Sequence, residues 1–418
     1  MADWSSLPSD LINRVGSRIL ATNDLDHYMD LRAVCHNWRS STADPRTTAA
    51  GEPRFRPRCW VMLEEHNNSS GRDDVKPKRL NVSGAAGRDG DTRLFVNAAT
   101  GRFLRKRLPL LLRRGGGGGY NLVTTTPGGF LVLSDRNPPH AARVLNPFTG
   151  AMVRFRAPMP RGETHYTAAV VNDSNDNPCF SFTLVMACLE SHRVYWADPE
   201  SEAFLFETCA RQPSGMLPYH AGKYAGRKHG AAAVTDADEQ ATKISNASWS
   251  SAELEHRICA VESTGGEILL VSLENSSHCV QVYKKSKGRS EQVTSLGNHA
   301  LFFGDRCLLV DADRLPSVDA NCVYYQLNGE EDDGLRYGIF RYDLAVGKAE
   351  RIAETVSANS LMAPDDHPLT LIQLLVNYAM YTQRYELIFA RVPEDLDLQY
   401  YCGDDDDEFE IDFDEFGD

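Results

Sequence analysis

Two hydrophobic patterns divide the chain. Over about the first forty residues, apolar side chains recur at every third or fourth position, which is the period of an amphipathic helix. From about Arg54 onward, short apolar runs alternate with clusters of Gly, Pro, Asn and Asp, which is typical of strands and turns. The sequence therefore predicts a small helical region followed by a larger region that is mainly β.

Three short helices are predicted between Trp4 and Ala43. Pro8 suits a first helical position because its missing N–H would be unpaired there, and Asn23-Asp24 can cap a second helix. The apolar stripes are, in chain order, Leu11, Val15 and Ile19; Leu25, Tyr28 and Met29; and Leu31, Val34, Cys35 and Trp38. Gly16 costs the first helix about 1 kcal/mol relative to Ala. Helices this short cannot bury a large core alone, so we expect their apolar faces to require a partner.

A hairpin with a similar turn recurs through the β region. Its six turns, separated by 38 to 59 residues, fall at Asn97, at Asn146, at Asp198, near Asp236, near Lys284 and at Asp343. Short strands that repeat about every 50 residues predict a kelch-like β-propeller, with one four-stranded blade per repeat. About six blades fit the intervals and seven are possible. The alternative is a pair of open β-sandwiches.

Two further segments bear on the propeller. Double glycines, Gly128-Gly129 and Gly265-Gly266, precede predicted strands, and we expect them to allow close backbone approach between neighbouring blades. The segment LTLIQLLVNYAMYTQRYELIF could supply closing strands or a helix. Residues 355–402 therefore have no assigned role at this point.

Composition is that of an ordinary water-soluble globular protein, with 42% hydrophobic and 24% charged residues among 418. No run approaches the roughly 20 apolar residues of a membrane helix, and the N-terminus lacks the apolar stretch of a secretory signal. The ten cysteines are scattered, without a C-x-x-C pair, so we expect them to be reduced and buried. These features lead us to expect a protein of the cytoplasm or nucleus with no membrane partner.

Charge is unevenly distributed along the chain. Of the net charge of −14, residues 404–418 contribute ten carboxylates and no Lys or Arg. From Arg54 to Arg114, fifteen Lys or Arg face six Asp or Glu, a balance of +9. We expect residues 403–418 to form an acidic disordered tail. The basic segments 76–79 and 105–107 are interpreted as a solvated rim of the first blades, which does not favour a nucleic-acid partner.

The spacing of residues in the helical region resembles an F-box. The shared pattern is Trp4, Leu7-Pro8-x-Asp10-Leu11, Val15, Ile19, Asp24 and Leu31-Arg32-x-Val34-Cys35-x-x-Trp38-Arg39. In that family the motif docks a Skp-type adaptor and so recruits a cullin-based ubiquitin ligase. The resemblance implies adaptor binding by Leu7, Pro8, Asp10, Leu11, Val15, Ile19, Leu31, Val34, Cys35, Trp38 and Arg39. The alternative is a small helical bundle packed on the main domain.

The second half of the β region resembles the KIB-type, kelch-like propeller of plant F-box proteins. The most specific element is SLGNHALFFG, at residues 295–304, and STGGEILLVSLEN and YGIFRYDLAVGKAERI also match. The implied organisation is an F-box at residues 4–43, a KIB-type propeller at residues 54–392 and the acidic tail. The resemblance further implies a substrate receptor of a Skp–cullin–F-box ubiquitin ligase, whose propeller holds an unknown target protein.

No enzyme motif is found in the chain. His278 and Cys279 are adjacent, but neighbours on a strand point to opposite faces, so we expect Cys279 to pack inward rather than react. No His or Cys spacing fits a metal site, and we expect no cofactor, metal or catalytic residue. The alternatives to a ligase receptor are a kelch-type propeller enzyme, such as an oxidase or hydrolase, and a non-ligase scaffold.

The acidic tail generates a first prediction. Phe409, Ile411, Phe413 and Phe416 interleave its carboxylates, which a purely solvating tail would not need. If these residues dock the tail on the basic Arg54–Arg114 region, truncation after Cys402 should strengthen retention on heparin at low salt by more than the charge change explains. The alternative is a free tail that only aids solubility. A full-length variant with the four apolar residues changed to Ser is the control, and its elution with the wild type would exclude docking through them.

Overall fold

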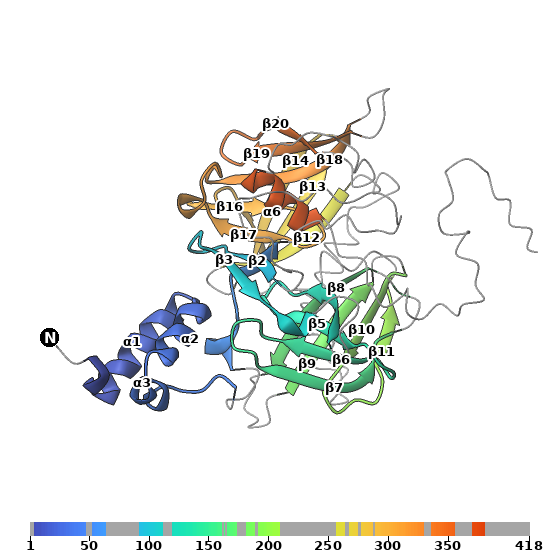
Figure 1. Ribbon diagram of the computed structural model, residues 1–418. Helices are drawn as coiled ribbons and strands as arrows, with labels where there is room; N and C mark the ends of the chain where they lie inside the picture. Colours follow the sequence, from blue (N-terminus) through green and yellow to red (C-terminus); the bar gives the residue numbers. More distant parts are fainter. Residues whose placement is uncertain are drawn as a thin grey trace, which may run out of the picture.

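The computed structural model describes residues 4–46, 52–63, 92–111, 119–160, 163, 165–173, 181–188, 191–209, 256–263, 267–274, 277–286, 289–329, 336–355 and 370–380. The predicted hairpin near Asp236 and the acidic tail lie outside these residues. Figure 1 shows three N-terminal helices beside a larger body of β-sheets. No helix within the described part is long and apolar enough to cross a membrane.

The helical region comprises a short 3-10 turn and three helices. They are η1 (Trp4–Ser6), α1 (Ser9–Ala21), α2 (Leu25–Ala33) and α3 (His36–Ser41). Pro8 is the residue that precedes α1, one position earlier than predicted. Asp24 caps α2 as predicted, because its side chain accepts a hydrogen bond from the backbone N–H of His27 at 3.1 Å. The third predicted stripe is wrong in one respect, since Leu31 belongs to α2 and α3 begins only at His36.

The described part of the β region forms five sheets. The first contains β1 (Trp60–Leu63), β2 (Thr92–Asn97) and β3 (Phe103–Arg107), and the second contains β4 (Tyr120–Thr125), β5 (Leu131–Asp135), β6 (Ala141–Leu145) and β7 (Met152–Pro158). The third contains β8 (Tyr166–Asp173), β9 (Ser181–Cys188), β10 (Arg193–Ala197) and β11 (Leu205–Thr208). The fourth contains β12 (His256–Glu262), β13 (Ile268–Glu274), β14 (Cys279–Ser286) and β15 (Arg289–Val293). The fifth has the order β17 (Leu308–Asp311), β16 (His299–Phe302), β18 (Cys322–Gly329), β19 (Arg336–Asp343) and β20 (Lys348–Thr355).

These sheets are the blades of a β-propeller. Neighbouring strands are antiparallel except β16 and β18, which run parallel. The described residues form five blades, whereas the hairpin spacing predicted about six. One of the hairpins used in that count, near Asp236, lies outside the described residues. The short helices η2 (Pro53–Phe55), η3 (Pro109–Leu111) and η7 (Ala312–Arg314), and the longer α6 (Leu371–Met380), complete the described elements.

Three of the predicted hairpins close through the same local chemistry. In each, a side-chain oxygen of Asn97, Asn146 or Asp343 accepts hydrogen bonds from the N–H groups two and three residues later. A glycine with positive φ follows at the fourth position, namely Gly101, Gly150 or Gly347, with φ between 69 and 72°. Such an Asx turn is encoded locally, so the sequence locates it reliably. The turn predicted near Lys284 is misplaced, because Lys284 pairs with Glu291 within the ladder of β14 and β15, which extends to Ser286 and Arg289.

The hydrophobic cores lie between neighbouring blades. One cluster joins the second and third blades, another joins the fourth and fifth, and a third joins the fifth to the first. At Gly129, a Cβ atom would lie 2.3 Å from the carbonyl oxygen of Pro57, just before β1, and 2.9 Å from that of Trp60, in β1 of the preceding blade. This confirms at one position the close backbone approach expected of the double glycines, while Gly265-Gly266 lies outside the described residues.

The fourth and fifth blades are also joined covalently. Cys259 on β12 and Cys307, next to β17, form a disulfide. The expectation that all ten cysteines stay reduced is therefore wrong for this pair. The structure brings together two residues that are 48 positions apart in sequence, a proximity that their spacing alone could not reveal.

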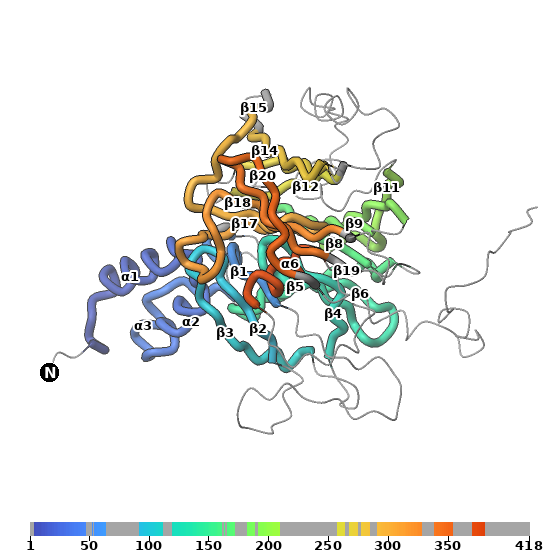
Figure 2. The backbone as a smooth tube through the Cα atoms, turned by 90° about the horizontal axis from the view of Figure 1, so that it is seen from above, coloured from blue at the N-terminus to red at the C-terminus, as the bar shows by residue number. Residues whose placement is uncertain are grey.

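Helix α6 closes the seam between the fifth blade and the first. The undecided segment after residue 355 thus supplies a helix, which packs against β1, β16 and β18 and is visible beside β1 in Figure 2. Leu375, Val376, Tyr378 and Ala379 are buried in the cluster that joins the two blades. The approach is tight, since a Cβ on Gly304 would lie 2.4 Å from the Ala379 carbonyl oxygen.

We predict that Leu375→Ala destabilises the propeller by about 2–5 kcal/mol, because it leaves a cavity in the seam between the first and last blades. The measurement is thermal unfolding of the full chain followed by circular dichroism. Asn377→Ala, a half-buried position on the same helix, is the matched control. Equal melting temperatures for both variants and the wild type would show that α6 does not hold the ring closed.

Candidate functional site

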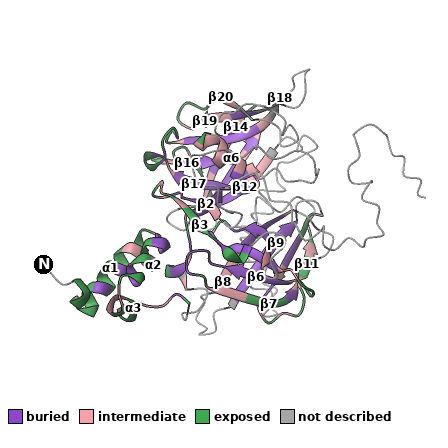
Figure 3. Ribbon diagram, in the orientation of Figure 1, coloured by how far each residue is buried: buried purple, intermediate pink, exposed green. Residues whose placement is uncertain are grey.

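The outer surface of the helical region presents apolar side chains that nothing in the described structure covers. Leu11 and Val15 on α1 are 40% and 46% exposed, and Val34, after α2, is 60% exposed. Trp4, in the turn before α1, is 69% exposed. Figure 3 shows α1 mostly exposed, in contrast to the buried strands of the sheets. A group of exposed apolar residues on one small region is typical of a protein-binding surface.

This exposure follows from how α1 packs. Its inward side is formed by Ile12 and Gly16, not by the Leu11–Val15 stripe. A Cβ on Gly16 would lie 3.1 Å from the Tyr28 ring, so the glycine allows α1 and α2 to approach closely. The sequence identified Gly16 only as a weak helix former. Its packing role could not be seen without the partner helix.

The predicted site residues are divided between surface and interior. Pro8, Asp10, Leu11, Val15, Val34 and Arg39 are exposed, and Leu7, Cys35 and Trp38 are half-buried. Leu31 is only 6% exposed and Ile19 packs against the core shared with the propeller. The structure therefore brings Leu11 and Val15 together on one face of α1, whereas Leu31 faces inward and Ile19 faces the propeller. Their contact with an adaptor stays a prediction.

Other residues of the helical region pack into a core that is shared with the first two blades. Leu25 and Tyr28 of α2 are buried in one cluster with Phe55, Trp60 and Phe148. The Tyr28 and Phe55 ring centroids are 5.6 Å apart, and those of Trp60 and Phe148 are 4.7 Å apart. The apolar partner that the short helices require is thus supplied in large part by the propeller itself.

An ion cluster surrounds this apolar contact. The Arg102 guanidinium donates to both oxygens of Asp24, at 2.8 and 2.7 Å, and to Asp26 at 2.6 Å. Lys106 Nζ donates to the other Asp26 oxygen at 3.0 Å. Burial by itself would raise the pKa of the Asp26 carboxyl, but Lys106 and Arg102 outweigh it and lower the pKa below its ordinary value of 3.8. Two residues of the basic Arg54–Arg114 region, Arg102 and Lys106, therefore bind the helical region.

Arg32 fixes the exit of the chain from α3. Its buried guanidinium donates to the carbonyl oxygens of Thr42, at 2.6 Å, and Ala43, at 2.7 Å, and pairs with Asp44 at 2.9 Å. The Tyr28 hydroxyl donates to the same Ala43 oxygen at 2.9 Å. The sequence placed Arg32 within the helical pattern without a function. Its partners are ten to twelve residues away in the chain, so its role as an anchor for this turn becomes visible only in the fold.

A family model described as the KIB1-4 beta-propeller matches residues 95–343, which is 249 of the 418 residues. The chain belongs to this family. The match confirms the resemblance of the β region to a KIB-type propeller. It begins within β2, so the N-terminal helices lie outside the part that defines the KIB1-4 family.

A curated relative connects the chain with F-box proteins. The Arabidopsis thaliana protein named "Putative F-box protein At1g65770" is 35% identical over 68 residues, which is 16% of this chain. The chain matches 17% of the length of that relative. Among solved structures, the fission yeast SREBP-SCAP binding-domain complex is 10% identical and aligns over 73% of this chain and 83% of its own, with a TM-score of 0.20.

The ion cluster predicts how the KIB1-4 propeller and the helices respond to acid. Because the folded-state pKa of Asp26 is lowered, its stabilising contribution is present above pH 3.8 and is lost as the pH falls from 3.8 through the lower folded-state pKa. Asp26→Asn should cost about 2 kcal/mol at neutral pH and reduce the acid dependence of stability. Melting temperatures at several pH values test this. Asp30→Asn, an exposed carboxylate on the same helix, is the control, and an equal effect of both variants would contradict the prediction.

Proposed function

We propose that this KIB1-4 propeller protein is the substrate-recognition subunit of a Skp–cullin–F-box ubiquitin ligase. In this proposal, the helical region at residues 4–43 is an F-box that binds a Skp-type adaptor. The propeller at residues 54–392 holds a target protein. Support comes from the F-box spacing of the helical residues, from the relative named as an F-box protein and from the family of the propeller.

The observation that carries the proposal is the asymmetry of the helical region. Leu25 and Tyr28 are buried against the first two blades. Leu11, Val15 and Val34 take no part in this packing and stay exposed. A helical bundle whose only role was to cover the propeller would have no reason to keep these side chains apolar. An adaptor that covers them would gain their burial, at about 25 cal/mol per Å² of apolar surface.

The mechanism in this proposal is positioning. The chain supplies no catalytic group, and the adaptor, cullin and conjugating enzyme provide the transfer chemistry. Tethering the target raises the effective concentration of its lysines near the conjugated ubiquitin. The ion cluster and the apolar contact beneath it hold the F-box at one angle to the propeller, so the distance between adaptor and target is set by this chain.

We predict that a Leu11→Ser, Val15→Ser double variant loses co-purification with the Skp-type adaptor. Each truncated interface anchor typically costs about 2 kcal/mol or more, so the affinity should fall at least tenfold. The variant should keep the melting temperature of the wild type because both side chains are already exposed. Arg14→Ala, an exposed change on the same helix, is the matched control.

The outcome separates the alternatives. Wild-type recovery of adaptor and cullin by the double variant would show that this face is not the adaptor-binding surface. Recovery of adaptor without cullin, by the wild-type chain itself, would point instead to a non-ligase scaffold. A variant with Leu7 and Pro8 both changed to Ala extends the test to the start of α1, where Pro8 is exposed and Leu7 half-buried.

A further inference from the structure

Lysine and arginine are segregated along the chain. Of the 44 cationic residues, 34 are arginines and ten are lysines, at positions 76, 78, 106, 223, 228, 243, 284, 285, 287 and 348. Residues 1–75, 107–222 and 349–418 together carry 22 of the 44, and every one of these is an arginine. The rest of the chain carries the other 22, of which ten are lysines. A general preference for arginine would act on both parts equally, so it does not account for the separation.

Most of the described residues in these ranges form a continuous part of the fold. They include the helical region and all the strands of the second and third blades. One apolar cluster joins the helical region to the first two blades, and another joins the second blade to the third. In Figure 1 these elements occupy the lower part of the view, with the fourth and fifth blades above them. We call this part, within residues 4–46 and 120–208, the arginine-only region.

Contacts explain some of the arginines in this region but not all of them. Arg32 and Arg143 each use several guanidinium donors at once, which a lysine ammonium could not reproduce. In contrast, Arg14 and Arg18 on α1 and Arg154 on β7 are exposed, and within the described part of the chain they form no hydrogen bond or ion pair. A lysine would carry the same charge at these three positions. The contacts of the fold therefore do not require arginine there.

The first blade places one lysine, Lys106, against the arginine-only region, and this lysine is engaged. Its Nζ donates to Asp26 of α2 at 3.0 Å and lies 5.4 Å from the centroid of the Phe148 ring. Its side chain is 23% exposed. The amine is therefore held in the ion cluster between the helices and the propeller.

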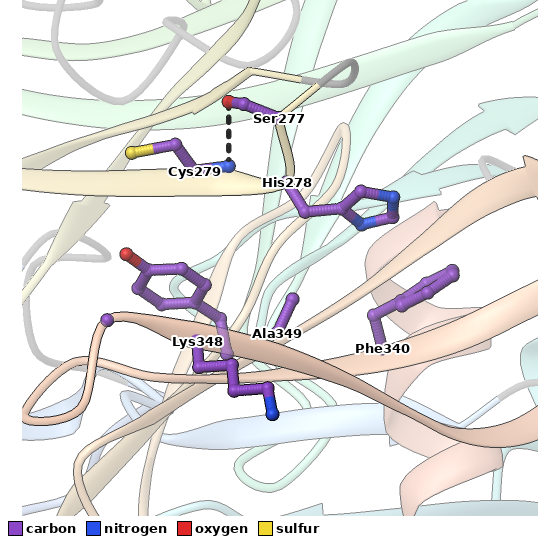
Figure 4. Close-up of a pocket in the computed structure, with 8 residues that line it drawn as sticks. Ser277, His278, Cys279, Phe340, Lys348 and Ala349 are labelled. Atoms are coloured by element: carbon purple, nitrogen blue, oxygen red, sulfur yellow. Dashed lines mark hydrogen bonds between the residues drawn. The ribbon is translucent and has the colours of Figure 1, made fainter.

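The other described lysines lie in the fourth and fifth blades. Lys284 and Lys285 belong to β14, and Lys348 begins β20. Lys348 is exposed, and Figure 4 shows its side chain directed away from His278 and Cys279 of the neighbouring blade. An accessible amine of the described structure is thus located outside the arginine-only region.

The two cations differ in the chemistry of ubiquitin transfer. In the proposed ligase, a neutral lysine amine attacks the carbonyl carbon of the thioester that joins ubiquitin to the conjugating enzyme. A C–N bond replaces the C–S bond, and the sulfur leaves with the amine proton as a free thiol. An arginine guanidinium stays protonated and delocalised, so it does not act as this nucleophile. Tethering raises the effective concentration of the target's lysines, and it does the same for any lysine of the receptor on that side.

We propose that the second and third blades face the ubiquitin-charged conjugating enzyme in the assembled ligase, and that arginine in place of lysine prevents this surface from accepting ubiquitin. The inference rests on the proposed function, because it requires the assembled ligase. It assigns an orientation to the chain: the lysines of the fourth and fifth blades are directed away from the enzyme. The lysines of a bound target are then the acceptors within its reach.

The test reconstitutes the ligase from the full chain, a Skp-type adaptor, the cullin module, the activating and conjugating enzymes and ubiquitin. Arg154→Lys adds an amine on β7, the outer strand of the second blade, without a change of charge. The fraction of receptor that carries ubiquitin should rise at least threefold above the wild type, and mass spectrometry should locate the added ubiquitin at position 154. Circular dichroism and adaptor recovery should equal those of the wild type, because the side chain is exposed.

Arg314→Lys is the matched control, because it makes the same change at an exposed position of η7, next to β17 of the fifth blade. Its self-ubiquitination should equal that of the wild type. An unchanged level in Arg154→Lys would overturn the proposal, and so would an equal gain in both variants, which would show that the enzyme reaches both sides alike. Failure of the wild-type chain to recover adaptor and cullin would overturn the proposed function and this inference with it. Normal assembly without a gain in Arg154→Lys would contradict the orientation alone.

Discussion

The contact on which the rest of the arrangement depends is the one between α2 and the first blade. Two carboxylates, Asp24 and Asp26, meet two cations, Arg102 and Lys106, so the cluster is neutral as a whole. Removing one of these four residues would leave an uncompensated charge at a partly buried site. The resulting loss of folding stability exceeds the net contribution of the intact ion pair. The cations also lie over aromatic rings, with Arg102 5.7 Å from the Trp60 centroid and Lys106 5.4 Å from that of Phe148. The ion cluster thereby fixes the orientation of the helical region on the propeller. The apolar contact below it supplies most of the stability of this contact.

This contact bears on whether the helical region and the propeller can fold separately. Ring closure alone suggests that a fragment starting near Gly51 would fold without the helices. However, Trp60, Phe95 and Phe148 share their cluster with Leu25 and Tyr28. Without α2, these aromatic side chains would lose part of their cover, and Arg102 and Lys106 would lose their carboxylates. The boundary between residues 43 and 54 therefore separates two segments of sequence that contribute to one core.

The sequence predicted those features that local chemistry determines. The Asx turns at Asn97, Asn146 and Asp343 need only their own five residues, and the Asp24 cap needs only the next helical turn. Features that depend on contacts between distant residues were missed or placed wrongly. Leu31 is buried and lies in α2, which extends to Ala33. Gly16 is needed because a side chain at that position would meet the Tyr28 ring. The Cys259–Cys307 disulfide can form only because two blades are adjacent. His278 lies just before β14, which begins at Cys279, so its contact with the Phe340 ring could not be predicted from strand alternation.

The first blade links the two ends of the described chain. Along β1, Trp60 and Met62 belong to the cluster shared with the helical region, while Val61 and Leu63 belong to the cluster that contains α6. β2 continues the alternation, with Phe95 on one side and Val96 on the other. This is why all four residues of β1 are buried, a pattern expected when both faces of a sheet are covered. Because packed interiors resist compression, a shift of α6 is transmitted to β1, with which it packs. The seam that closes the ring and the contact that orients the helices are therefore opposite faces of one three-stranded blade, and the position of the exposed α1 surface depends on both.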